Sequence, residues 1–386
     1  MTREFIDFVE AHKDEDTARL LLSAARYPAI DMTAAVQQIE GFRTAREKWP
    51  RLLECEEFVY PPRLNREQAS SETTADYKAT LILPFTSHLS PFTLADLTGG
   101  MGVDTLAFAR VAKHVDYMER DPQLCALMRH NLEALGIGNV TVHCTDSMEW
   151  LAEQTTLYDL IFIDPARRSS TGRKVAAFED CTPNIMEHSE LLRRHCRHLM
   201  VKASPMIDID LACRQLGDVA EVHIVGVKGE CKEVLFVCGE PSGEPQIVCG
   251  SFAFTRSEET MAEGCYCQQV GRYLYEPDAT LMKGGPFKLL AQRYGLKLLG
   301  RNTHLYTSDR RIDDFPGRVF EVLQELKLSK KEVSAVIPEG KAHVVTRNYP
   351  MEAAALQKQL GLKEGGEKFV IATTVGTLKK GVLAKM

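Results

Sequence analysis

Four acidic side chains lie at or just past the ends of short apolar segments: Asp96, Glu119, Asp146 and Asp164. A carboxylate at such a position can accept hydrogen bonds from the hydroxyl groups of a ribose or from an amine. The first acid opens the glycine-rich run Asp-Leu-Thr-Gly-Gly-Met-Gly-Val-Asp, residues 96–104. Glycines let the backbone approach a ligand closely, and the start of a following helix offers free N–H groups. This combination indicates a nucleotide-like ligand.

The glycine-rich run stands between a strand-like segment, 92–97, and a helix-like segment, 104–111. A strand, a glycine-rich turn and a helix form the first half of a nucleotide-binding βαβ unit. The predicted cofactor contacts in this run are Asp96, Thr98, Gly100, Met101 and Gly102. A nicotinamide dehydrogenase is the nearest rival, but it would place a third glycine at position 105, where this chain has threonine.

The next two strand ends supply further acids. Glu119 with Arg120 ends a second strand about twenty residues on, where a carboxylate can accept from both ribose hydroxyls. Asp146 follows a third strand and can accept from an adenine amine, while Ser147 begins the next helix. The alternative is that these acids are ordinary helix caps or turn residues. Acids at three consecutive strand ends favour ligand binding.

The elements that would position these residues alternate between short apolar runs and helical periodicity. The predicted strands are 92–97, 114–118, 140–144, 160–163, 198–201, 221–227 and 234–238, the last two forming a hairpin. The predicted helices between them are 104–111, 122–135, 147–153, 183–196 and 208–216. This alternation is typical of a doubly wound, mostly parallel α/β sheet.

The regions before and after the predicted α/β sheet have different patterns of apolar residues. Residues 1 to about 70 have helical periodicity, with Asp31 as an N-cap; Ser70 or Ser71 is expected to cap a further helix that ends near Leu83. After a linker at 241–245 and a small mixed region, the order helix 319–326, strand 333–337, strand 342–346, helix 351–360 and strand 368–374 predicts an α+β module. The predicted domains are 1–78 (helical), 79–241 (catalytic), 246–314 (mixed) and 315–386 (α+β).

Composition excludes several classes of protein. No apolar run has the length of a membrane span, and the N-terminus lacks the apolar core of a signal peptide. The eleven cysteines lack framework or zinc-ligand spacing, which indicates reduced thiols in a cytoplasmic protein without a metal site.

Charge is distributed unevenly along the chain. Residues 270–386 carry 20 Lys and Arg against 12 Asp and Glu, whereas the remainder carries 27 against 41. A basic C-terminal third on an acidic body favours a polyanionic partner, although a lysine-rich solvated surface would give the same count.

The acids and the glycine loop resemble the class I S-adenosylmethionine-dependent methyltransferases. The family's first motif is matched by Asp96, Gly100 and Gly102, with Thr98 where a glycine is more usual. The resemblance implies that S-adenosyl-L-methionine is the cofactor, that the loop approaches its methionine part, and that Glu119 and Asp146 hold its ribose and adenine.

The fourth strand ends in Ile163-Asp164-Pro165-Ala166-Arg167-Arg168, at the place of the Asp/Asn-Pro-Pro-aromatic motif of amino-group methyltransferases. The resemblance implies that Asp164 and the Pro165 carbonyl accept hydrogen bonds from the target nitrogen. Arg167 stands in place of the aromatic, and a guanidinium plane can also stack on a base. Phe178 is the other candidate for the missing ring, and the basic residues 167–174 for phosphate contact.

Two wider comparisons follow from these motifs. Asp-Pro-x-Arg also resembles the RNA uracil C5-methyltransferases, but these need a cysteine where the chain has Lys202-Ala203-Ser204-Pro205, which disfavours covalent C5 chemistry. Nearly the whole chain resembles a bacterial family of RNA methyltransferases with a THUMP-like C-terminal module. The residues that carry this likeness lie at 70–79, 164–168, 202–205, 275–278 and 302–308. The core motifs are also similar to a bacterial small-subunit rRNA guanine methyltransferase.

The sequence therefore predicts a cytoplasmic S-adenosylmethionine-dependent methyltransferase that acts on rRNA or tRNA, at a base nitrogen, with Asp164, Pro165 and Arg167 as catalytic residues. Asp164 is predicted to contact the cofactor as well, together with Glu119, Arg120, Asp146, Ser147 and the glycine loop. The alternatives are a methyltransferase for protein or small molecules, and a non-catalytic RNA-binding protein that retains the cofactor fold.

Overall fold

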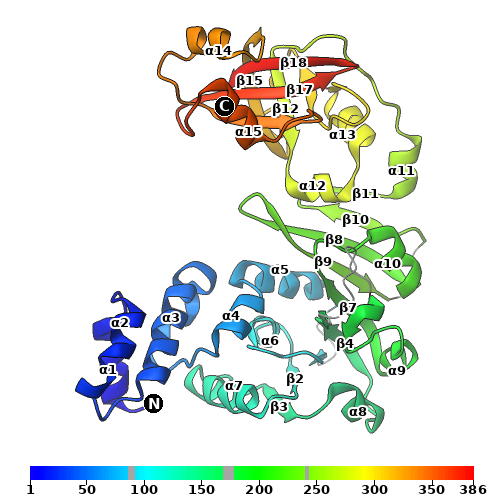
Figure 1. The fold of residues 1–386 in the computed structure, drawn as a ribbon. Coiled ribbons are helices and arrows are strands. Elements are labelled where there is room, and N and C mark those ends of the chain that lie inside the picture. Colours follow the sequence, from blue (N-terminus) through cyan, green and yellow to red (C-terminus); the bar gives the residue numbers. More distant parts are fainter. Residues whose placement is uncertain (86–91, 168–177, 240–242) are drawn as a thin grey trace. The chain divides into compact units, whose positions relative to one another are not determined.

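The computed structural model describes residues 1–85, 92–167, 178–239 and 243–386 (Figure 1). The chain forms two compact units: unit 1 comprises Met1–Ala220 with Val234–Pro241, and unit 2 comprises Glu221–Glu233 with Ser242–Met386. The fold is of the α/β class with a second C-terminal sheet, as predicted. The division between the units runs through the hairpin of β8 (Val219–Val227) and β9 (Glu230–Cys238).

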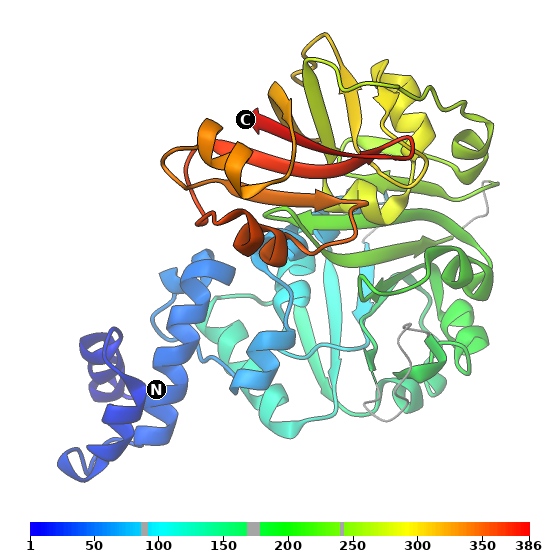
Figure 2. The ribbon, with the colours of Figure 1, turned by 45° about the horizontal axis from the view of Figure 1, so that its top comes forward.

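The N-terminal part of unit 1 is helical, as the periodicity predicts. Helices α1 (Arg3–His12), α2 (Thr17–Leu22) and α3 (Met32–Lys48) enclose a small core of their own around Phe8, Leu20 and Ile39. Figure 2 shows these helices as a blue group next to the N-terminus. The Asp31 carboxylate accepts a hydrogen bond from the Ala34 N–H, so the predicted N-cap of α3 is confirmed.

Two further helices lead to the sheet. They are α4 (Arg63–Gln68) and α5 (Glu72–Ile82), and Ser71 caps α5 by accepting from the Thr74 N–H. One face of α5 is buried through Ala75, Lys78, Ala79 and Ile82, which follow the spacing of an amphipathic helix. Ala75, Ala79 and Ile82 join a core that includes Phe108 of α6 (Val103–Ala109).

The sheet of unit 1 positions the predicted acids. Its strands β7-β4-β1-β2-β3 lie in that order and are parallel to one another. Their bounds are β1 (Thr93–Asp96), β2 (His114–Glu119), β3 (Val140–Cys144), β4 (Tyr158–Ile163) and β7 (Cys196–Ala203). Parallel strands bring their carboxyl ends to one edge, and the strand order reverses between β1 and β4, where open α/β sheets bind ligands.

The helices between these strands are α6, α7 (Pro122–Ala134), α8 (Ser147–Ala152), α9 (Ser189–His195) and α10 (Ile209–Leu216). The predicted helix 183–196 is too long, because the Asn184 side chain accepts from the N–H groups of Met186 and Glu187 and makes a turn first. A short pair of strands, β5 (Ala166–Arg167) and β6 (Cys181–Thr182), was not predicted. On its other side β7 pairs antiparallel with β9, beyond which follow β8, β10 (Gln246–Cys249) and β11 (Phe252–Phe254).

Unit 2 has its own sheet, in the order β13-β14-β12-β15-β18-β17-β16. The strands are β12 (Tyr273–Pro277), β13 (Lys297–Leu298), β14 (Tyr306–Ser308), β15 (Gly317–Leu326), β16 (His343–Arg347), β17 (Lys368–Val375) and β18 (Leu378–Lys385). The helices are α11 (Arg256–Met261), α12 (Ala279–Gly284), α13 (Phe287–Tyr294), α14 (Lys330–Val336) and α15 (Ala353–Leu360).

Two secondary-structure predictions in unit 2 are wrong. Residues 319–326, predicted as a helix, form strand β15, where a register shift between Val322 and Gln324 disturbs the alternation and mimics helical spacing. Of the residues 333–337, predicted as a strand, the first four belong to α14 and Ile337 is its C-cap; Ser329 caps the start of α14 by accepting from the Glu332 N–H. The Ser-x-x-Glu pattern before the apolar residues carried that helix signal. Strand β18 was not predicted from the sequence.

Candidate active site

Asp96 fixes the start of the glycine loop. Its side chain is 1% exposed, and it accepts hydrogen bonds from the Thr98 N–H (3.1 Å) and the Thr105 hydroxyl (2.5 Å). Burial raises the pKa of Asp96 to about 7, since the low-polarity surroundings disfavour the charged form. Because Thr98 and Thr105 lie near the two ends of the loop, these hydrogen bonds to Asp96 stabilise the conformation of the loop from its buried side.

The glycines allow the loop to pass close to the sheet. A Cβ on Gly99 would lie 2.1 Å from the Tyr117 ring, and one on Gly102, whose φ is +86°, would lie 2.5 Å from the Met128 sulfur. The Tyr117 hydroxyl donates to the Gly100 carbonyl at 2.6 Å, which fixes the loop further. By contrast, the one atom of the described residues within 4 Å of a Cβ on Gly100 would be the Thr98 carbonyl oxygen, at 3.8 Å, so among these residues this side of the loop is open.

Glu119 lies at the end of β2 and is joined directly to the glycine loop. Its carboxylate accepts from the Gly100 N–H at 3.0 Å and from the N–H groups of Arg120 (2.7 Å) and Asp121 (2.9 Å). Three N–H donors fix the orientation of the carboxylate and leave lone pairs on its oxygens for further donors. The structure therefore places Glu119 beside the loop, as expected from the strand order.

Asp146 caps α8. Its Oδ1 accepts from the N–H groups of Met148 and Glu149, while Oδ2 lies 3.7 Å from Nη1 of Arg120. The cap leaves Oδ2 directed away from the helix, so the roles of helix cap and ligand acceptor are compatible in one side chain. Ser147 is 7% exposed and begins α8, and Met101 is likewise 7% exposed within the loop region.

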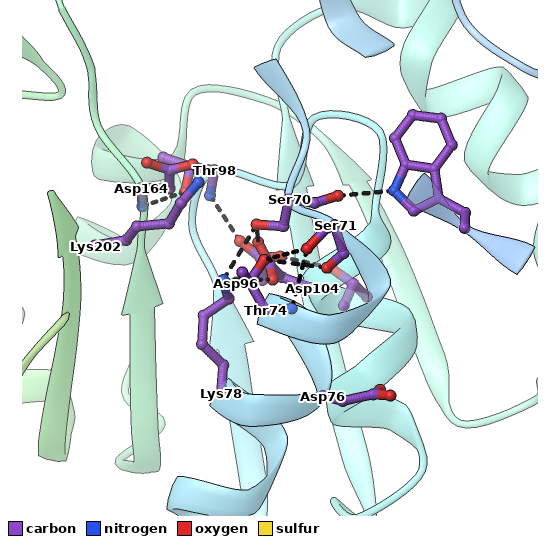
Figure 3. Close-up of polar contacts among 12 residues, drawn as sticks. Ser70, Ser71, Thr74, Asp76, Lys78, Asp96, Thr98, Asp104, Asp164 and Lys202 are labelled. Carbon is purple, nitrogen blue, oxygen red and sulfur yellow. Dashed lines mark hydrogen bonds and ion pairs between the residues drawn. The ribbon is translucent and has the colours of Figure 1, made fainter. Parts of the chain in front are cut away.

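Asp164 follows β4 and connects two neighbouring strands (Figure 3). Its N–H donates to the Thr98 hydroxyl at 2.7 Å, and its carboxylate forms an ion pair with the Lys202 ammonium. Ile163 pairs with Val201 in the sheet, so the residues that follow them are neighbours. The side chain of Asp164 is 35% exposed and that of Lys202 only 12%, which leaves the carboxylate as the more accessible partner.

Lys202 was not identified as a site residue from the sequence. It was considered only as part of the segment 202–205, which lacks the cysteine that the C5-methyltransferases need. An ionisable side chain directly after the apolar run 198–201 was the signal. Its aliphatic stem is buried at the sheet edge, and its charge lies at the carboxylate that is expected to face the acceptor.

A second missed group lies at the start of α6. The Lys78 ammonium is fully buried and lies 3.1 Å from Asp104 Oδ1 and 3.1 Å from the Ser70 hydroxyl, which itself donates to Asp104 Oδ2 at 2.7 Å. Figure 3 shows Lys78 and Ser70 both directed at Asp104. A lysine within the apolar stripe of α5 signalled such a buried ion pair. This contact ties α5 to the helix that follows the glycine loop.

Three further candidates have different outcomes. Pro165 is half-buried next to Asp164. The backbone of Arg167 pairs with Cys181 in the short β5–β6 ladder, whereas its side chain and residues 168–177 of the basic segment lie outside the described residues. Phe178 is 1% exposed and packs edge-on against Phe236 with ring centroids 5.8 Å apart, so the expectation that it offers a stacking ring is wrong.

The described residues contain no group of His, Cys, Asp and Glu side chains arranged to hold a metal ion, and the eleven cysteines are free thiols. No helix in the described ranges has the length and apolar character that crossing a membrane requires.

Three family descriptions match separate segments of the chain. Residues 73–192 match the family Conserved hypothetical protein 95, residues 273–316 match a ferredoxin-like domain, and residues 317–385 match a THUMP domain-like family. The first segment contains the glycine loop and the acids at the ends of β2 and β4, and the other two lie in unit 2.

Similar whole proteins are known in sequence and in structure. A crystal structure of a candidate methyltransferase from Porphyromonas gingivalis W83 is 30% identical and covers 99% of this chain and 97% of that chain, with a TM-score of 0.86. Uncharacterized S-adenosylmethionine-dependent methyltransferases from two strains of Mycobacterium tuberculosis are 24% identical over 316 residues, 80% of this chain and 83% of theirs. The chain belongs to the class I S-adenosylmethionine-dependent methyltransferases that carry a THUMP-like C-terminal domain.

Proposed function

We propose that this methyltransferase modifies RNA, at a base nitrogen of rRNA or tRNA. The observation that carries the proposal is the hydrogen bond from the Asp164 N–H to the Thr98 hydroxyl. It connects the acid expected to face the acceptor to the loop expected to contact the cofactor, so both partners of the reaction would be held at one edge of the sheet. Such positioning is the main requirement of an in-line methyl transfer.

The residues at this edge suit S-adenosylmethionine. The open side of Gly100 leaves room for close approach of a ligand to the backbone. We assign the methionine part to the loop from Asp96 to Gly102, the ribose hydroxyls to the Glu119 carboxylate, and the adenine amine to Asp146. When bound, the cofactor supplies an electrophilic methyl group on its sulfonium.

The acceptor side belongs to Asp164 and the Pro165 carbonyl, which would accept hydrogen bonds from the target nitrogen and aim its lone pair. The buried stem and charge of Lys202 hold the Asp164 carboxylate at the edge of the sheet. Arg167 would stack on the base or bind a phosphate. The nitrogen gives up a proton when it gains the methyl group, and we assign the partly exposed Asp164 carboxylate as the group that accepts it.

The preference for RNA is supported by two features of unit 2. The region 270–386 has an excess of eight basic over acidic residues, and residues 317–385 match the THUMP domain-like family. An excess of positive charge is the electrostatic footprint expected of a protein that binds a polyanion.

A transfer assay tests the proposal. The purified protein is incubated with tritiated S-adenosylmethionine and, separately, with total RNA and ribosomal protein from a strain that lacks the gene, and labelled nucleotides are then identified in an RNA digest. We expect label in RNA that is absent when RNA from the parent strain is used, because its sites are already methylated. Label confined to protein would contradict the RNA assignment, and absence of label in every fraction would favour a non-catalytic role.

A further inference from the structure

A buried carboxylate in unit 2 holds two arginines at once. Glu276, on β12, is 4% exposed. Arg318 of β15 stands directly opposite it in the sheet, donates Nε to Oε2 at 2.7 Å and also contacts it through Nη2. Arg347, the last residue of β16, forms an ion pair with Oε1. Two cations on one carboxylate leave this group with a net charge of +1.

Both guanidinium groups contact the buried Glu276 carboxylate, and both arginine side chains are partly exposed to solvent. The side chains of Arg318 and Arg347 are 44% and 42% exposed. Arg318 also lies over the Phe320 ring, 5.4 Å from its centroid, and Arg347 Nη1 donates to the Thr346 carbonyl at 2.8 Å. The contact at Oε1 of Glu276 is an ion pair without hydrogen-bond geometry. Within the described part of the chain, no second acid pairs with either arginine.

The backbone next to Arg347 is held in one conformation. Asn348 has a φ of +50°, in the left-handed region that asparagine adopts more readily than most residues other than glycine. Its side chain donates to the Thr303 hydroxyl at 3.1 Å, and its carbonyl accepts from the Thr374 hydroxyl at 2.6 Å. Because these contacts fix the end of β16, the position of Arg347 is set before any ligand arrives.

Other ion pairs of the same unit lack this excess charge. Arg311 pairs with Asp313, Lys380 with Glu325 and Lys385 with Glu321, one cation to one acid in each described case. Each of these pairs is close to neutral, whereas Arg318 and Arg347 share a single carboxylate.

We propose that Arg318 and Arg347, oriented by Glu276, form a fork that binds a phosphate of the RNA backbone. A guanidinium presents N–H donors in a plane that matches a phosphate, and arginine is favoured where such two-point contacts are made. The fork contacts the backbone and therefore positions the RNA without reading its sequence. This inference rests on the proposed function, and it joins residues from both matched segments of unit 2.

The salt dependence of RNA binding tests the fork. The full-length protein and its variants are titrated into a fluorescein-labelled 20-base-pair RNA duplex at several KCl concentrations, with anisotropy as the readout. Arg318→Ala and Arg347→Ala should each weaken binding about tenfold in 0.1 M KCl and reduce the slope of log K against log [KCl] by about 1, as one phosphate contact is lost.

A further variant controls for the loss of an arginine as such. Arg311→Ala removes an arginine of similar exposure, 48%, that already has its own acid, and it should leave the slope unchanged. Slopes for Arg318→Ala and Arg347→Ala equal to those of the wild type and Arg311→Ala would overturn the fork.

Competition identifies the kind of ligand. Unlabelled RNA duplex should displace the probe in the wild type, and poly-glutamate at equal charge should not; preferential displacement by poly-glutamate would overturn an RNA site. The failure of this inference is distinguishable from that of the proposed function. Methylation of RNA with unchanged salt slopes rejects the fork alone, whereas methylation of protein and not RNA rejects the proposed substrate.

Discussion

Asp96 in unit 1 and Glu276 in unit 2 are both buried acids, 1% and 4% exposed, yet their surroundings are opposite in kind. Asp96 accepts from a backbone N–H and a hydroxyl, both neutral donors, whereas Glu276 is matched by two arginines. A buried carboxylate without a cation is easily protonated and serves to hold its own loop. A buried carboxylate with two cations instead orients positive charge toward the solvent.

Buried acids serve the two proposed binding sites of this protein in different ways. Asp96 acts on the inner side of the cofactor loop, whereas the half-buried acids Glu119 and Asp164 are the ones proposed to contact ligands. In unit 2 the acid Glu276 is buried, and the side chains of the two arginines that it pairs with are partly exposed to solvent. We therefore expect the acids at the edge of the first sheet to bind hydrogen-bond donors of a cofactor or an acceptor. We expect the fork in unit 2 to bind phosphates.

The largest effect is expected at the acid that faces outward. Asp164→Ala should lower the rate of methyl transfer about 10³-fold, because positioning of the acceptor and acceptance of its proton are lost together. Cofactor affinity, measured by calorimetry, should stay within about threefold, since cofactor recognition is assigned to Glu119 and the loop. Turnover equal to that of the wild type would contradict the role of Asp164.

Asp96 makes the contrast with Glu276 measurable through pH. The pKa of Asp96 is raised to about 7 in the folded protein, so folding favours its protonated form, and this contribution is lost as pH rises from about 4 to about 7. The free energy of unfolding of the wild type relative to Asp96→Asn should therefore fall by about 3 to 4 kcal/mol over that range. Urea unfolding at both pH values measures it, and a difference independent of pH would argue against a raised pKa.

Glu276→Ala should destabilise unit 2 by about 2 kcal/mol, because two arginines then face each other without their anion. We reduce the figure expected for a buried pair, since both arginines are more than 40% exposed and solvent screens them. Denaturant unfolding with and without 1 M KCl measures the effect, which salt should diminish. Unchanged stability in low salt would show that the arginines do not depend on the acid.

The smallest effect concerns the ribose acceptor. Glu119→Ala should weaken S-adenosylmethionine binding about tenfold, or about 1.4 kcal/mol, as hydrogen bonds to the hydroxyls are lost. Glu133→Ala, which removes an exposed acid of α7 away from the loop, is the matched control. Equal affinities of the two variants in calorimetry would reject ribose recognition by Glu119.

Most of the sheet in unit 1 could be read from the sequence, because each strand is a short apolar run ended by a polar residue. The prediction of β3 coincides with the structure, and that of β1 differs only at its ends. Unit 1 differs from the prediction in the shorter helix α9 and the unpredicted pair β5–β6, whereas helix and strand were exchanged only in unit 2, at 319–326 and 333–337. A bulge in β15 displaces its apolar residues from strict alternation, and the seven residues of α14 make fewer than two helical turns, too few for a clear repeat.

The sequence by itself determined the acids, their order along the chain and the glycines that a close loop requires, because these depend on local residue type and spacing. Only the tertiary structure decided which side chains meet. Lys202 pairs with Asp164 at the ends of two neighbouring parallel strands, and Lys78 of α5 pairs with Asp104 of α6. Arg347 of β16 pairs with Glu276 of β12, which is not its neighbour in the sheet. Spacing along one chain carries no information about such pairs, since they form where sheet order and helix packing bring separate segments together.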